Sequence, residues 1–314
     1  MALTNGVICG AIARRSSLAV PPLMLGSLLA LATAWSWAFS TFLYNRSASR
    51  LSAAQLTLIK SLISAAVLGL VVMAGDLATP LSATARSELL ISGAIGIGIG
   101  DVCFFAAMRI LGPRQALLLD CLAAPCALML SLVSAAGLPS LPQIAAMGLV
   151  LASVAWVISE RIPQRPSPTR AHRLGVLWGI AAAAAQAIGL VMSHHAMLSD
   201  GVDPVWAATL RLAAGAVISG LACAWMARSG QRWQWPAPAA WPLLLAAILI
   251  GTTLALYLMQ KALTLAHPAL VQTLIATSPI WALVIARLAG ERISRRAVGG
   301  ALMAVVGVAL VVSL

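Results

Sequence analysis

The chain has 314 residues, of which 61% are hydrophobic and only 9% are charged, and its formal net charge is +12. Roughly a quarter of the residues of a soluble domain are charged, so this composition and a mean hydropathy of +0.97 exclude a soluble globular protein and indicate an integral membrane protein. The arginines are spread over short segments between apolar runs rather than gathered in one basic patch, so nucleic acid is not an expected partner.

Ten apolar runs are each long enough to cross the hydrocarbon core of a bilayer, which takes about 20 residues of helix. The first run follows Arg14 and Arg15, and it is too long for the hydrophobic part of a signal peptide, so we expect it to be the first span. Glycines, prolines and short polar segments separate the runs. The sequence therefore predicts an all-α multi-pass membrane protein with ten transmembrane helices near residues 23–44, 54–74, 87–109, 113–136, 141–159, 174–197, 204–227, 240–263, 266–289 and 296–314.

The longest polar segment is ERIPQRPSPTRAHR, residues 160–173, with three prolines and four arginines. It cannot continue either neighbouring helix, because proline lacks the amide donor and clashes with the preceding turn. The segment leaves five spans on each side. We therefore expect a first five-helix unit over residues 1–160, a linker over 161–173 and a second five-helix unit over 174–314.

The two halves contain similar features at a nearly constant spacing. Lys60 and Arg211, each a single basic residue inside an apolar helix, are 151 residues apart, and Pro125 and Pro279 are 154 apart. The same spacing of 154 relates VAWVIS to VALVVS. These matches indicate a duplicated five-helix unit. Because five is odd, the two copies insert in opposite orientations, as in the inverted repeats of many secondary transporters, with the substrate site between them.

These features resemble the EamA-type drug/metabolite transporter family over nearly the whole chain. The resemblance rests on LLALATAWSWAFS, on the basic residue of the second span and above all on the stretch from Gly251, with Tyr257, Pro279, Gly290-Glu291-Arg292, Ser294 and Gly300. It implies a ten-helix carrier for a small metabolite or drug in a bacterial inner membrane. The first half departs from the family pattern, with Gly137 where the repeat would place an acidic residue and Lys60 in place of an arginine.

Four charged residues, Lys60, Asp101, Asp120 and Arg211, lie well inside the predicted spans rather than at their ends. Each costs about 2.5 to 3.5 kcal/mol at bilayer depth, so each needs a partner, a cavity or a function. At 1.5 Å per residue, Lys60, Asp101 and Asp120 lie about 9 to 12 Å from the same membrane face. They could neutralise one another and exchange a proton for substrate in a wet cavity, or form a buried ion pair that fixes helix packing. The stretch GAIGIGIG before Asp101 also suits close helix packing.

Arg211 lies about 10 Å from the opposite face. Its planar guanidinium would suit a carboxylate or phosphate substrate, or it could form a gate salt bridge with Asp203 or Asp200. Among uncharged residues, Tyr257 and Gln272 are candidates to line a substrate cavity, with Trp37 as an aromatic wall.

The sequence contains none of the common motifs of hydrolases, nucleotide-binding proteins or intramembrane metal enzymes. Its five cysteines lack metal-ligand spacing, so we expect no metal and no cofactor. The favoured function is secondary transport by alternating access, with a small molecule as substrate, protons as a candidate coupling ion and the lipid bilayer as environment. The alternative is a membrane-embedded enzyme or a lipid-handling protein that does not use alternating access.

The loop charges and the resemblance disagree on orientation. Fourteen arginines flank the odd-numbered loops, and four basic residues lie on the other side. Since positive residues favour the cytoplasm, this count places both termini outside. The family resemblance places both termini in the cytoplasm.

Overall fold

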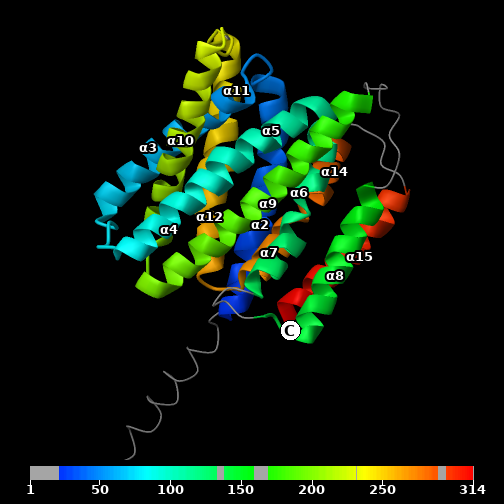
Figure 1. The fold of residues 1–314 in the computed structure, drawn as a ribbon. Helices are drawn as coiled ribbons and strands as arrows, with labels where there is room; N and C mark the ends of the chain where they lie inside the picture. Colours follow the sequence, from blue (N-terminus) through cyan, green and yellow to red (C-terminus); the bar gives the residue numbers. More distant parts are fainter. Residues whose placement is uncertain (1–20, 133–137, 159–168, 231, 289–294, 314) are drawn as a thin grey trace, which may run out of the picture.

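A computed structural model describes residues 21–132, 138–158, 169–230, 232–288 and 295–313 (Figure 1). Several residues singled out in the sequence lie outside these ranges. They are Arg14, Arg15, Gly137, the 160–168 part of the polar segment, Gly290, Glu291, Arg292 and Ser294.

The described residues form a bundle of helices (Figure 1). The helices of the first half are α2 (Pro22–Ser47), α3 (Ala53–Gly75), α4 (Ala83–Gly93), α5 (Gly100–Leu111), α6 (Pro113–Asp120), α7 (Ala123–Ser131) and α8 (Leu141–Ile158). Those of the second half are α9 (Thr169–Asp200), α10 (Pro204–Arg228), α11 (Trp241–Ile248), α12 (Ala255–Leu263), α13 (Pro268–Ile275), α14 (Ser278–Leu288) and α15 (Arg295–Ser313).

These helices account for the ten spans predicted from the sequence. In the described part of the chain, seven helical stretches are long and apolar enough to cross a membrane, and the other three spans contain the shorter apolar helices Gln115–Ser131, Leu141–Ser153 and Val298–Val311. The all-α multi-pass fold is therefore confirmed. Helix α9 begins at Thr169, directly after the last proline of the polar segment, so the end of the predicted linker is already helical.

Local sequence signals explain where several spans begin. Pro22, Pro113, Pro204 and Pro268 each stand at the first helical position, where the missing amide donor costs nothing. Helix α3 instead starts with a capping box, in which the Ser52 hydroxyl accepts from the backbone of Gln55 and the Gln55 side chain accepts from the backbone of Ser52.

Contacts between helices follow the inverted repeat. Equivalent spans of the two halves pack on each other: the second on the seventh (α3 with α10), the fourth on the ninth (α7 with α13 and α6 with α14) and the fifth on the tenth (α8 with α15). The third span (α4 and α5) packs on α9, and its counterpart, the eighth span (α11 and α12), packs on α2. The pattern is unchanged when the halves are exchanged, as a two-fold relation requires. In Figure 1, α8 and α15 lie side by side at one edge of the bundle.

The third and eighth spans also share an interruption. Each contains a π-helical segment of six residues, Ala94–Ile99 in the third span and Leu249–Leu254 in the eighth. Such segments widen a helix locally and are frequent at functional sites. They occupy equivalent places in the two repeats, which locates the centre of the two-fold relation in the middle of the bundle.

Two apolar clusters pack on either side of this middle level. Along α2, Ala30 belongs to one cluster and Tyr44 to the other. Along the eighth span the order is reversed, with Ile248 in the second cluster and Leu263 in the first. The residues between these limits on both spans therefore lie between two layers of apolar packing.

Candidate functional site

A cavity lies between the two apolar clusters and is lined by residues from both halves. Its volume available to the centres of water-sized molecules is about 40 Å³. The polar lining residues are Thr33, Trp37, Lys60, Asp101, Asp120, Gln186, Arg211, Thr252 and Gln272, and the apolar part comes from Ile97, Gly251, Ala255, Leu256, Met259 and Ile275. All four intramembrane charges predicted from the sequence thus line one cavity.

Lys60 and Asp101 form a buried ion pair. The Lys60 Nζ lies 2.5 Å from Asp101 Oδ2, and both side chains are almost fully buried. Lys60 comes from α3 and Asp101 from the first turn of α5, directly after the π-helical segment. The Gln186 amide of α9 approaches the other Asp101 oxygen at 3.5 Å. Because each charge neutralises the other, the pair can persist at bilayer depth.

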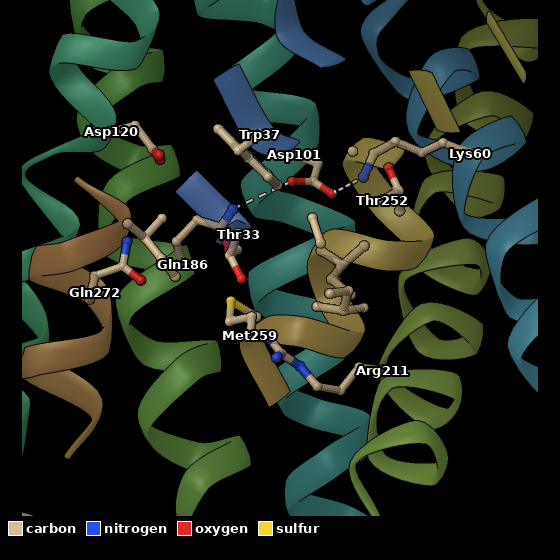
Figure 2. A pocket seen from close by; sticks show the side chains of 15 residues that line it. Thr33, Trp37, Lys60, Asp101, Asp120, Gln186, Arg211, Thr252, Met259 and Gln272 are labelled. Atoms are coloured by element: carbon tan, nitrogen blue, oxygen red, sulfur yellow. Dashed lines mark hydrogen bonds and ion pairs between the residues drawn. The ribbon is translucent and has the colours of Figure 1, made fainter. Parts of the chain in front are cut away.

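Asp120 has no ion-pair partner among the residues that the structure describes. It is the last residue of α6, where the fourth span breaks before α7, and it is 6% exposed. Its Oδ1 atom has no hydrogen-bond partner among the described residues. Figure 2 shows Asp120, Asp101 and Lys60 across one level of the cavity with Arg211 on the other side of Met259. The shared depth of Lys60, Asp101 and Asp120 expected from helix geometry agrees with this placement.

Arg211 lies at the opposite side of the cavity and is fully buried. Its Nη1 donates to Gln260 Oε1 at 2.7 Å, and the Gln260 amide donates to the Ser193 hydroxyl at 2.7 Å. The Nε and Nη2 atoms of Arg211 have no partner in the described part of the chain. A buried guanidinium with two unused donors is costly unless an anion or water meets it.

The salt bridge considered for Arg211 is absent. Asp203 instead caps α10 by accepting from the backbone of Val205 at 2.8 Å, and Asp200 accepts from the backbone of Ser82 at 2.7 Å. Both carboxylates are thus engaged at the helix ends, while Arg211 lies two turns inside α10. The alternative of a gate salt bridge with Asp203 or Asp200 is therefore wrong for this conformation.

The uncharged candidates divide into two groups. Trp37 and Gln272 line the cavity, whereas Tyr257 packs on the apolar cluster around Leu68 and Leu212 and is absent from the lining. Gln186 also lines the cavity and is not among the residues expected from the sequence, although a single amide in the alanine-rich stretch IAAAAAQAIGL is a signal of a polar site.

Polar contacts between the halves lie on both sides of the cavity. On the side of the first loop, the Tyr44 hydroxyl is 2.8 Å from the Thr252 hydroxyl, and Tyr44 meets Phe105 edge to face. On the other side, His195 Nδ1 lies 2.8 Å from Glu88 Oε2, near the Ser82 to Asp200 bond. Contacts between the two halves are therefore present on both sides of the level of the cavity.

The sequence model of the EamA-like transporter family matches residues 24–159 and again residues 173–313. The chain belongs to this family. The two matches correspond to the two five-helix halves, and the family assigns the protein to the drug/metabolite transporters. None of the curated proteins matches the chain.

Similarity to solved structures supports the same architecture. One of them, described as "Crystal structure of protein", has a TM-score of 0.73 and 18% sequence identity, and the match covers 91% of this chain and 96% of that one. At this identity the likeness concerns the fold alone. The EamA assignment and the central cavity together describe a membrane transporter with its polar residues at the interface of two inverted repeats.

Proposed function

We propose that the protein is a secondary carrier that moves small zwitterionic metabolites, of which amino acids are the simplest, across a bacterial inner membrane by alternating access. The observation that carries the proposal is the pair of unsatisfied groups in the cavity, the Asp120 carboxylate and the Arg211 guanidinium. Asp120 belongs to the first half and Arg211 to the second. A ligand that joins them therefore bridges the two repeats.

The charges of the cavity define the substrate class. Lys60 and Asp101 neutralise each other, which leaves the Asp120 carboxylate and the Arg211 guanidinium without a partner of opposite charge among the described residues. An ammonium group would be bound by Asp120, and a carboxylate would accept from the free Arg211 donors, since guanidinium and carboxylate match in geometry. A zwitterion satisfies both groups and adds no net charge to the bilayer interior. Trp37 and Met259 would contact its apolar part.

In this conformation the cavity is too small for a metabolite. Its volume of about 40 Å³ holds a few water molecules, because a cavity needs about 10 to 15 Å³ to hold one. A metabolite therefore requires the halves to move apart on one side. Breaking Tyr44 from Thr252 would open the side of the first loop, and breaking Glu88 from His195 would open the other.

Asp120 is also the proposed site of proton coupling. When the ammonium group leaves, the carboxylate would take up a proton and so avoid a bare charge in the cavity. Substrate and proton then compete for Asp120, and one is exchanged for the other. Asp101 is less suited to this role because Lys60 already neutralises it.

Selective masking of substrate charges tests the assigned substrate class. Purified protein in liposomes should transport a labelled amino acid but neither its methyl ester nor its N-acetyl derivative. Asp120→Asn should relax the requirement for the ammonium group, and Arg211→Gln the requirement for the carboxylate. Equal transport of all three compounds by the parent protein would refute the proposal that the substrate is a zwitterion.

A pH-sensitive dye inside the liposomes tests the coupling. Addition of a transported amino acid should change the internal pH, and Asp120→Asn should abolish this change. Asp76→Asn, at the exposed C-terminal end of α3, is the control variant and should behave as the parent. Proton movement at the parent rate in Asp120→Asn would remove Asp120 from the coupling mechanism.

A further inference from the structure

A second and larger pocket lies at one end of the bundle, apart from the central cavity. Its volume available to water-sized molecules is about 350 Å³. It is formed where α3 begins, α5 ends and α10 ends. The lining residues are Arg50, Ser52, Gln55, Arg109, Cys223, Met226, Ala227, Arg232, Trp233 and Gln234. None of the central charged residues belongs to it.

The pocket concentrates positive charge, and none of the described residues that line it carries a negative charge. Arg50, Arg109 and Arg232 line it, and no acidic residue does. Among the described residues, the ion pairs are Lys60 with Asp101 and His195 with Glu88, so none of the three arginines has a carboxylate partner. Arg109 makes one long bond of 3.4 Å to the Ala48 carbonyl and keeps its other donors free. Three guanidinium groups around one hollow favour an anion with several acceptor oxygens, such as phosphate.

The remaining walls differ in polarity. Gln55 and Gln234 add amide groups, whereas Met226, Ala227 and Cys223 form an apolar side along the last turns of α10. Trp233 lies at the pocket and packs edge to face on the exposed Trp235, an arrangement typical of the membrane interface. A freely soluble phosphate would use only the charged wall. An amphiphile with a phosphate head group would use both.

We propose that this pocket binds the phosphate head group of an anionic phospholipid, with the arginines on the phosphate and the acyl chains leaving along the apolar side of α10. Basic pockets between transmembrane helices at a membrane surface are suited to such head groups. The ligand contacts both halves, since Ser52 and Arg109 belong to the first and Met226 and Arg232 to the second. Lipid binding therefore favours the arrangement of the halves in which the pocket is formed.

Thermal unfolding in detergent with added ligands tests the proposal. The unfolding temperature of the parent protein should rise when short-chain phosphatidylglycerol is added, but not when phosphatidylcholine of the same chain length is added. Each arginine near an anionic lipid contributes about a fivefold change in affinity. The triple variant Arg50→Gln, Arg109→Gln, Arg232→Gln should therefore need on the order of 100-fold more lipid.

A matched triple variant distinguishes binding at this pocket from a general effect of positive charge on the protein surface. Arg46→Gln, Arg228→Gln, Arg287→Gln removes three exposed arginines flanking odd-numbered loops that do not line the pocket, and it should keep the parent response. If the two triple variants respond equally to phosphatidylglycerol, the proposed binding site is wrong. A response to glycerol phosphate but not to the lipid would overturn the phospholipid as the ligand. Failure of amino-acid transport would leave this result unaffected, because the assay involves no transport.

Discussion

At the scale of single residues, the Lys60–Asp101 pair sets the electrostatic balance of the cavity. Removing one member leaves the other as a buried charge, which costs about 3 to 5 kcal/mol. We expect Lys60→Met and Asp101→Asn each to lower the free energy of unfolding by this amount. The double variant should lose less than the sum, because no unpaired charge remains. Thermal or denaturant unfolding in detergent measures all three.

The more exposed His195–Glu88 pair is the control for this cycle. Exposed ion pairs contribute about 0 to 1 kcal/mol, so Glu88→Gln should change stability little. If the losses of unfolding free energy in Lys60→Met and Asp101→Asn add up in the double variant, the two charges do not stabilise each other.

The sequence predicted part of this arrangement for a physical reason. Regular helix geometry converts a residue's position in its span into a depth, which correctly grouped Lys60, Asp101 and Asp120. It could not predict the Arg211 partner, because the choice between Asp203, Asp200 and Gln260 depends on side-chain direction and on competition from helix caps. The functional roles of these residues remain predictions.

At the scale of helices, close approach of α4 to α10 holds the Arg211 backbone in place. A Cβ atom at Gly93 would collide with the Arg211 backbone. Gly93→Ala should therefore force the helices apart and cost about 1 to 3 kcal/mol. Gly148→Ala in α8, where a Cβ meets no atom within 4 Å, should be neutral or slightly stabilising. Unfolding midpoints of the two variants should differ accordingly, and equal midpoints would contradict the close packing.

Element positions were more predictable than their internal breaks. Hydropathy and proline placement located all ten spans, since a bilayer imposes a minimum length on apolar helices. The π-helical segments Ala94–Ile99 and Leu249–Leu254 were not predicted, because hydropathy does not distinguish a π-helical turn from an α-helical one. The glycines of GAIGIGIG were expected to pack closely, and Gly96 does lie against Gly189.

At the scale of the molecule, transport requires the two halves to separate on alternate sides. Ser82 and Asp200 join the halves on the Glu88 side of the cavity. In a cysteine-free background, Ser82→Cys with Asp200→Cys should allow a short thiol cross-linker to hold that side closed and stop exchange. A reducible linker should restore exchange after reduction. Each single-cysteine variant is the control, and undiminished exchange after complete cross-linking would exclude opening on that side.

Counterflow is the decisive measurement of whether the cavity carries a zwitterion across the membrane. Liposomes containing the purified protein and an unlabelled amino acid are placed in a trace of the labelled compound. We predict transient accumulation of label inside, which is lost in Arg211→Gln and retained in the control variant Asp76→Asn. Absence of counterflow for every amino acid, or unchanged counterflow in Arg211→Gln, would contradict this prediction.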